Sequence, residues 1–206
     1  MRRRQFVSGF AMATLWPVAV RAQRGDRVRH IGILVGVAES DLEARAILMA
    51  FLQELRRLGW TDDRNARFDI RYGESDPGRI RKYAAELVAL APDVILAIGP
   101  SSVAALLDAT RTVPIVFTIV PDPVGAGFVD SLAEPSGNAT GFLTFEYSLA
   151  GKWLELLKEV APKIRRVAVL RDPAITAGTG QFAVIQSVAP SVGVDLRPID
   201  VRSSRH

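Results

Sequence analysis

Short apolar runs alternate with longer segments in which apolar residues recur at helical spacing, and this alternation continues through most of the chain. Short apolar runs bounded by turn residues favour buried strands, and a spacing of three or four favours helices. The predicted strands occupy residues 31–37, 68–72, 93–99 and 114–120. The predicted helices between them occupy residues 42–58, 76–92 and 101–110. Because each connection is long enough for a crossover, the pattern predicts an α/β fold with a doubly wound parallel sheet.

The same pattern begins again in the last third of the chain. Residues 121–137 form the longest irregular stretch, in which a helical turn is predicted over 127–132. Further elements are predicted over residues 139–144, 148–160, 166–170, 181–189 and 194–201. We therefore expect a first α/β lobe over 29–145, and a connecting helix with the start of a second α/β lobe over 146–206. Two parallel strands cannot cover both faces of their sheet, so we expect this second lobe to be truncated.

Residues 1–22 predict an export signal peptide. Three arginines at positions 2–4 precede a mostly apolar stretch over 6–20, and Val20 and Ala22 suit a cleavage directly after the latter. A membrane-spanning helix requires about 20 apolar residues, so this stretch is too short to be one. We expect an exported, periplasmic protein, and both the general secretory and the twin-arginine route fit these residues.

The charge and the rare residue types exclude several function classes. The net charge is +4, and four arginines lie within the first 22 residues, so the rest of the chain is neutral and offers no basic surface for nucleic acid. Cysteine is absent and the only histidines are His30 and His206, which argues against a zinc site or a histidine-based catalytic triad. The chain contains neither the Gly-x-Gly-x-x-Gly sequence of dinucleotide-binding proteins nor the Gly-Lys-Ser/Thr sequence of a phosphate-binding loop. We therefore expect no cofactor, no metal and no enzyme.

Ligands of open parallel sheets bind where strands end and helices begin. Three strand-end loops qualify in this chain, over residues 36–41, 99–102 and 120–124. Ser101 and Ser102 offer hydroxyl and backbone N–H groups at a positive helix end, which suits a carboxylate. Asp122 suits an ammonium group. Together these three residues predict a clamp for an amino-acid zwitterion.

Each candidate also has a structural interpretation. Either of the two serines can be an ordinary helix N-cap. Asp122 stands before Pro123, itself a candidate ligand contact, and this pair is typical of the start of a turn. Ser40 is the candidate ligand residue of the first loop, but Ser40 and Asp41 are equally good caps for the helix that follows.

Several segments resemble a single family. They are residues 91–95, 99–102, 114–117, 122–129 and 135–141. The chain is similar to the substrate-binding protein family of ABC importers that includes the tryptophan- and tyrosine-binding proteins, and the similarity spans residues 29–202. The most specific part is the Asp-Pro-Val-Gly sequence at 122–125, followed by Gly-Asn-Ala-Thr-Gly at 137–141.

This resemblance implies a type I periplasmic-binding-protein-like fold, in which two lobes close on a ligand. It also implies an amino acid-like solute, aromatic amino acids included, and an ABC permease in the inner membrane as partner. From the second lobe, Arg171, Asp172 and Thr176 occupy the corresponding strand-end loop. Tyr147 is expected to reach the cleft, whereas Trp153 is expected in the core, and residues 144–146 would be the hinge.

Three other functions share this architecture. An enzyme built on the same sheet would need catalytic or nucleotide-binding motifs of the kinds named above, and this chain lacks them. The effector domain of a transcription regulator would follow a DNA-binding helix-turn-helix, where this chain has an export signal. A periplasmic ligand-sensing module that serves a membrane receptor fits the same residues as the transport role does.

Overall fold

The structure is a computed structural model that describes residues 27–201. The predicted export signal at residues 1–22 lies outside the described residues. Among the described helices, none combines the length and the apolar character that a lipid bilayer demands of a spanning segment.

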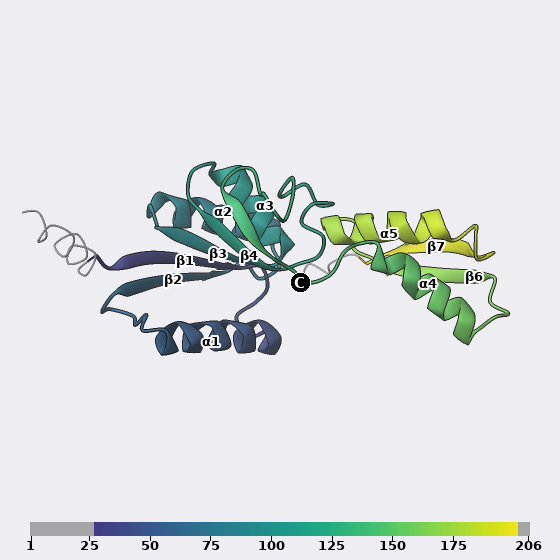
Figure 1. Cartoon of the computed structure of the whole chain (residues 1–206), viewed down its shortest axis with the longest axis horizontal. Helices are drawn as coiled ribbons and strands as arrows, with labels where there is room; N and C mark the ends of the chain where they lie inside the picture. The colour runs from purple at the N-terminus through teal and green to yellow at the C-terminus, as the bar shows by residue number, and fades with distance from the viewer. Residues whose placement is uncertain (1–26, 202–206) are drawn as a thin grey trace, which may run out of the picture.

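The first part of the chain folds into a five-stranded parallel sheet with helices on both faces (Figure 1). Its strands are β1 (Arg29–Val35), β2 (Ala66–Tyr72), β3 (Val94–Ile98), β4 (Ile115–Val120) and β5 (Ala139–Leu143). The crossover helices are α1 (Leu42–Arg57), α2 (Pro77–Ala89) and α3 (Pro100–Ala109). The strand order is β2-β1-β3-β4-β5, and all neighbouring pairs are parallel. The predicted doubly wound sheet is thus confirmed, and we call this part the five-stranded unit.

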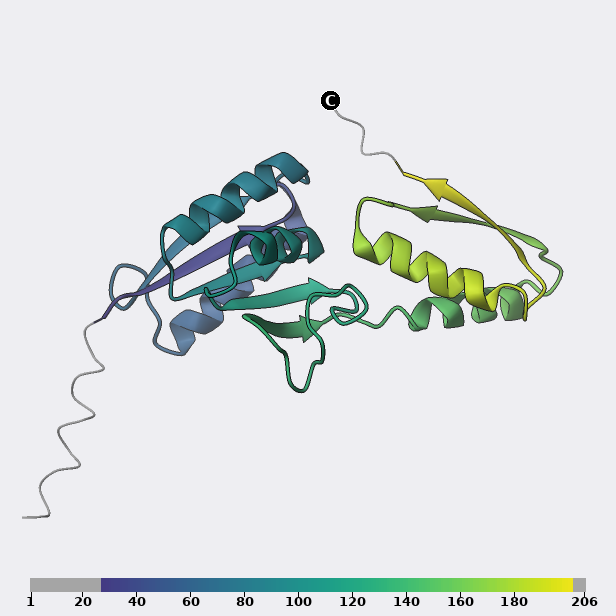
Figure 2. The same ribbon diagram turned by 90° about the horizontal axis from the view of Figure 1, so that it is seen from above.

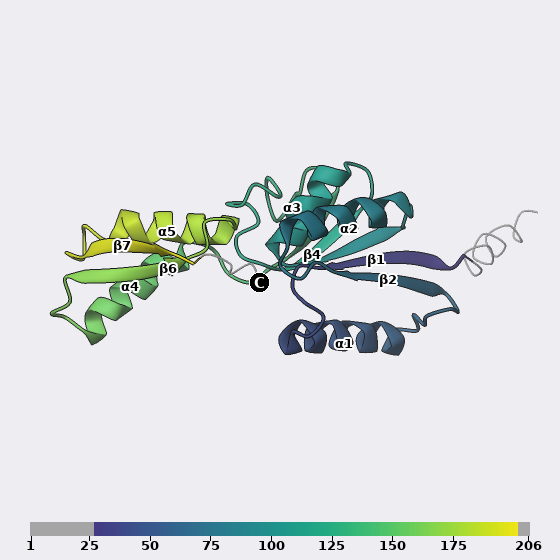
Figure 3. The same cartoon turned by 180° about the vertical axis from the view of Figure 1, so that it is seen from behind.

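Successive residues of β1, which lies between β2 and β3, point into two separate cores. Ile33 and Val35 lie in the core that α1 covers, whereas Leu34 lies in the core that α2 and α3 cover. Figure 3 shows α1 on one side of the sheet and the other two helices opposite it. The strand is buried on both faces toward its end, which is why residues 31–35 include no polar side chain.

A connector after β5, residues 144–148, leads into a smaller part of the chain, which we call the two-stranded unit (Figure 2). It consists of α4 (Leu149–Val160), β6 (Arg166–Arg171), α5 (Thr176–Val188) and β7 (Asp195–Asp200). β6 and β7 pair in parallel, and Leu154 of α4 packs with α5 and one face of these strands. The opposite face carries Leu170 and Ile199, which are 73% and 43% exposed. One face of this sheet is therefore uncovered, which agrees with the expectation that a unit with only two parallel strands cannot cover both faces.

The buried side of α4 differs from the prediction. Trp153 is 47% exposed instead of lying in the core, and its ring meets that of Phe145 edge to face with centroids 5.7 Å apart. The buried residues are the small ones, Ala150 and Gly151, together with Leu154. Gly151 lets α5 approach, because a Cβ at this position would lie only 3.0 Å from the Val188 side chain. The helix partner, and not the largest apolar residue, thus decides which side is buried.

Two boundaries also differ. α5 begins at Thr176, five residues before the predicted start at 181. Residues 127–132 form no helical turn, since the turn of this loop covers residues 123–127. The hydrogen bond from the Ala126 N–H to the Asp122 carbonyl oxygen, over 2.8 Å, holds that earlier turn.

Candidate functional site

The carboxyl ends of the parallel strands form one edge of the sheet, and this edge faces the connector (Figure 1). β1 and β3 are neighbours in the sheet, but the helices that follow them leave to opposite faces. Ligands of doubly wound sheets bind at such a reversal, in the space between the two strand-end loops, and we call this place the crevice. The predicted loops 36–41 and 99–102 flank this crevice.

Gly36 and Ser101 face each other at the crevice. A Cβ built on Gly36 would lie 2.7 Å from the Ser101 hydroxyl oxygen, so a larger residue there would displace the serine side chain. Ser101 is half-buried. Within residues 27–201 its hydroxyl makes no hydrogen bond. This hydroxyl is therefore available to a ligand.

The start of α3 places backbone donors beside that hydroxyl. Gly99 is the N-cap, with a φ of 88°, and Pro100 is the first helical residue. A positive φ favours glycine, and the first helical position suits proline. The alternative that either serine caps this helix is therefore wrong. Ser101 and Ser102 lie in the first turn instead, where N–H groups without helical partners and the helix dipole favour an anion.

Ser102 differs from its neighbour. It is fully buried, with 0% of its surface exposed, and its hydroxyl donates to the Ile98 carbonyl oxygen over 3.0 Å. This bond ties the first turn of α3 to the last residue of β3. The two adjacent serines thus differ, since of the two hydroxyls only that of Ser101 lacks a hydrogen-bond partner among residues 27–201.

Asp122 follows β4 in the third strand-end loop. Its Oδ1 accepts from the Gly125 N–H over 2.7 Å, and its Oδ2 accepts from the Tyr147 N–H over 3.1 Å. The interpretation of Asp122 as a turn residue is therefore confirmed. A Cβ built on Gly125 would lie 2.8 Å from this carboxylate, so the turn requires glycine. Pro123 is fully buried and lies out of reach of a solute at the edge.

The end of β4 is irregular. Its pairing with β5 shifts register between Phe117 and Val120. Ile119 has a φ of 57° and Asp122 a φ of 39°, a range that strains residues with a Cβ. Bulges and strained residues of this kind concentrate beside functional sites. After the bulge, the Asp122 N–H donates to the Phe145 carbonyl oxygen over 2.8 Å, which brings the loop against the connector.

Tyr147, Asp172 and Thr176 lie where the connector enters the two-stranded unit. Tyr147 is only 6% exposed, and a Cβ built on Gly180 of α5 would overlap its ring. The Tyr147 and Thr176 hydroxyl groups are buried and have no hydrogen-bond partner among the described residues. Asp172 is half-buried, and its Oδ1 accepts from the Ala174 N–H over 2.9 Å. The Tyr147 ring thus packs on a helix instead of lying open to a cleft.

The first loop uses one of its two cap candidates. Asp41 is the N-cap of α1, and its carboxylate accepts from the Ala44 N–H over 2.9 Å. Ser40 is exposed in the turn that precedes it. Ser40 therefore stays a predicted ligand residue without a structural task in the helix.

Sequence reasoning missed Tyr72, the last residue of β2. Burial raises the pKa of Tyr72, the charge of Glu39 raises it further, and Arg45 opposes both. The half-buried phenol therefore stays neutral and can donate a hydrogen bond at the same edge. Its position at the end of a predicted strand is the one sequence signal for this residue. The sequence does not show that β2 pairs with β1 and so brings Tyr72 close to the first strand-end loop.

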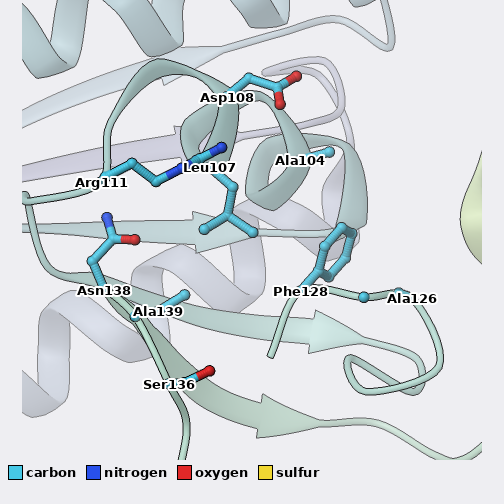
Figure 4. A pocket seen from close by; sticks show the side chains of 11 residues that line it. Ala104, Leu107, Asp108, Arg111, Ala126, Phe128, Ser136, Asn138 and Ala139 are labelled. Atoms are coloured by element: carbon cyan, nitrogen blue, oxygen red, sulfur yellow. The ribbon is translucent and has the colours of Figure 1, made fainter. Parts of the chain in front are cut away.

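A separate pocket of about 400 Å³ lies against the second half of α3 and the start of β5 (Figure 4). Asp108, Arg111, Phe128 and Asn138 are among the residues that line it. The side-chain amide of Asn138 already donates to the Val113 carbonyl oxygen over 2.8 Å. This pocket lies near the amino end of β5, so the crevice, with its free hydroxyl and helix N–H groups, is the better candidate site. Within residues 27–201, no three side chains of His, Cys, Asp or Glu are placed to hold a metal ion.

Comparison with known sequences gives one family. Residues 30–206 match the family described as ABC transporter substrate binding protein. A tyrosine-binding protein from Clostridioides difficile is 36% identical over 142 residues, which is 69% of this chain and 40% of that protein. The chain therefore spans less than half the length of this curated relative.

Solved structures give the same fold. A conserved domain protein from Vibrio cholerae is 28% identical with a TM-score of 0.75, over 85% of this chain and 58% of that one. An ABC domain from Streptococcus pneumoniae in complex with L-Trp is 25% identical with a TM-score of 0.73, over 84% of this chain and 57% of that one.

Proposed function

This chain belongs to the family of ABC transporter substrate-binding proteins, and from this premise we propose that it binds a small zwitterionic solute of the amino-acid class. The relative named for tyrosine binding and the solved neighbour in complex with L-Trp support this ligand class. The five-stranded and two-stranded units act as lobes that close on the solute. The protein works in the periplasm and passes its solute to an ABC permease.

The free hydroxyl of Ser101 opposite Gly36 is the observation that carries this proposal. The solute carboxylate would accept hydrogen bonds from this hydroxyl and from the first-turn N–H groups of α3. A hydrogen bond to a charged group contributes about 1.5–3 kcal/mol. Gly36 leaves room for the Ser101 side chain at this position.

The solute ammonium group would lie near Asp122. Each oxygen of this carboxylate accepts one backbone N–H, and a carboxylate has lone pairs for further donors.

The role is binding and not catalysis, because the family is defined by substrate binding. The one histidine of the described residues, His30, pairs with Asp69 over 2.5 Å at the opposite edge of the sheet and is no base for this site.

Ligand titration with matched analogues tests the zwitterion clamp. L-Trp and L-Tyr should raise the melting temperature of the purified chain, because a ligand that binds only the native state stabilises it by mass action. Tryptamine lacks the carboxylate and indole-3-propionate lacks the ammonium group, so both should bind far more weakly than L-Trp. Equal shifts with L-Trp and tryptamine, or no shift with any amino acid, would contradict the proposal.

Two neighbouring variants test the site itself. Ser101→Ala should weaken amino-acid binding about ten-fold or more, by the loss of a charged hydrogen bond, and change the unfolding free energy by less than about 0.5 kcal/mol. Ser102→Ala should lower the unfolding free energy by about 0.5–1.5 kcal/mol, since its hydroxyl bonds the Ile98 carbonyl. Calorimetric titration and denaturant unfolding measure the two effects. The reverse pattern would remove Ser101 from the site.

A further inference from the structure

Within the described residues, the chain passes once between its two units, through the connector between β5 and α4 (Figure 2). Three hydrogen bonds fasten the start of this connector to the end of β4. The Thr144 N–H donates to the Val120 carbonyl oxygen over 3.0 Å, and the Asp122 N–H donates to that of Phe145 over 2.8 Å. The third bond is the one from the Tyr147 N–H to Asp122 Oδ2 over 3.1 Å. Only this third bond uses a side chain.

Tyr147 is held from both sides. Its backbone N–H is bound by the five-stranded unit through Asp122. Its ring is buried in the two-stranded unit, against Gly180 of α5, where any side chain would overlap it. A displacement of the Asp122 carboxylate therefore acts directly on the residue whose ring is packed against the second unit.

The same carboxylate also holds the strand-end turn. Its other oxygen accepts from the Gly125 N–H over 2.7 Å, and Asp122 adopts a φ of 39° to reach both partners. The turn after β4 and the connector thus share one side chain. Either hydrogen bond alone could be accepted by the single oxygen of an asparagine. To accept both N–H groups on separate oxygens, the side chain must be a carboxylate.

We propose that Asp122 is a positioning residue that sets the angle between the two units through its bond to the Tyr147 N–H. The proposal goes beyond ligand binding, since it concerns the geometry of the free chain. It predicts that loss of the Oδ2 acceptor alone frees the connector while the turn stays intact.

Asp122→Asn separates the two tasks of the carboxylate. Asparagine tolerates a positive φ and has one acceptor oxygen where aspartate has two. In the orientation that keeps the bond from the Gly125 N–H, its amide nitrogen faces the Tyr147 N–H and cannot accept from it. Asp130→Asn is the matched control. Asp130 is an exposed carboxylate of the same loop, and it accepts from the Ser136 hydroxyl without touching the connector.

The distance between two spin labels, one on each unit, reports a change in the angle between the units. The chain has no cysteine, so Ala85→Cys on α2 and Gln186→Cys on α5, both exposed positions, give one defined label pair in the full chain. Electron–electron distance measurements are made without ligand, so the outcome does not depend on the proposed function. Circular dichroism establishes that each variant is folded.

The expected result is a wider or shifted distance distribution in Asp122→Asn, and a distribution like that of the parent in Asp130→Asn. A distribution for Asp122→Asn that superimposes on the parent would overturn the proposal. An equal widening in both variants would overturn it as well, because the effect would then belong to the loop and not to the bond with Tyr147.

Discussion

The buried hydroxyl of Tyr147 has no hydrogen-bond partner among the described residues. A buried polar group without a partner costs about 1–3 kcal/mol. Tyr147→Phe removes this group and keeps the ring on Gly180, so the variant should be more stable than the parent by up to about 1 kcal/mol. Denaturant unfolding without ligand measures the change.

A matched result should come from Thr176→Val, which removes the other unpartnered hydroxyl and keeps a similar volume. A loss of stability in Tyr147→Phe would show that the phenol has a partner in solution.

The paired serines show how far residue-level prediction reaches. Helix polarity points to both Ser101 and Ser102, and both lie in the first turn of α3, where N–H groups have no helical partner. Which hydroxyl is free depends on the rotation of the helix about its axis. That rotation is set by the core beneath α3 and by the cap at Gly99, and neither is visible in the local sequence.

At the scale of elements, Asp93 fastens the start of β3 to the start of β1. Its carboxylate accepts from the His30 N–H and from the Arg29 side chain, each over 2.9 Å. The hydrogen bond from His30 lowers the pKa of Asp93 from its ordinary value, the nearby Arg29 and Arg27 lower it further, and burial opposes them. The stabilisation from this group is therefore present above its unfolded pKa and is lost as the pH falls through the folded one.

Asp93→Asn should consequently destabilise the protein at neutral pH, and the difference from the parent should shrink as the pH falls below about 4. Denaturant unfolding of both proteins between pH 7 and pH 2.5 measures this difference. Asp108→Asn is the control, because Asp108 is exposed and forms no ion pair within residues 27–201. A difference that stays constant with pH would contradict the assigned cause.

The elements themselves are largely predictable from the sequence. Strands buried on both faces carry continuous apolar runs, and amphipathic helices repeat with their own period, so most boundaries agree within a few residues. The order of the strands is not encoded in any single segment. α4 is the clearest failure, because Trp153 is expected in the core but is 47% exposed, and Leu157 and Val160 of the same helix are 41% and 85% exposed. Burial depends on the partner, which for α4 is α5 on the side of Gly151.

At the scale of the whole molecule, the two units have separate cores. Leu154 lies in the core of the two-stranded unit and takes no part in the cores of the five-stranded unit. Leu154→Ala should destabilise the smaller unit by about 2–5 kcal/mol, the usual range for a buried leucine. Amide hydrogen exchange should then quicken in α5 and β6 and stay unchanged in β1 and β3.

Leu156→Ala provides the comparison, since Leu156 lies on the same helix and is 55% exposed. It should change the exchange of neither unit measurably, because surface substitutions usually alter stability by less than about 0.5 kcal/mol. Faster exchange in β1 and β3 of Leu154→Ala would mean that the two cores unfold together, and would contradict their independence.

The strand order of the larger sheet also determines when the chain can finish folding. β1 pairs with β2 and β3, with Arg29 opposite Ala66 and Ile31 opposite Val94, and none of its partners is a hairpin neighbour. During synthesis, β1 therefore waits until more than sixty further residues have emerged before both of its edges are paired. Such distant pairing makes folding slow. A long unfolded interval is a disadvantage inside the cell. For the periplasmic location that we propose, it is also the period in which a machinery that exports unfolded chains can bind the polypeptide.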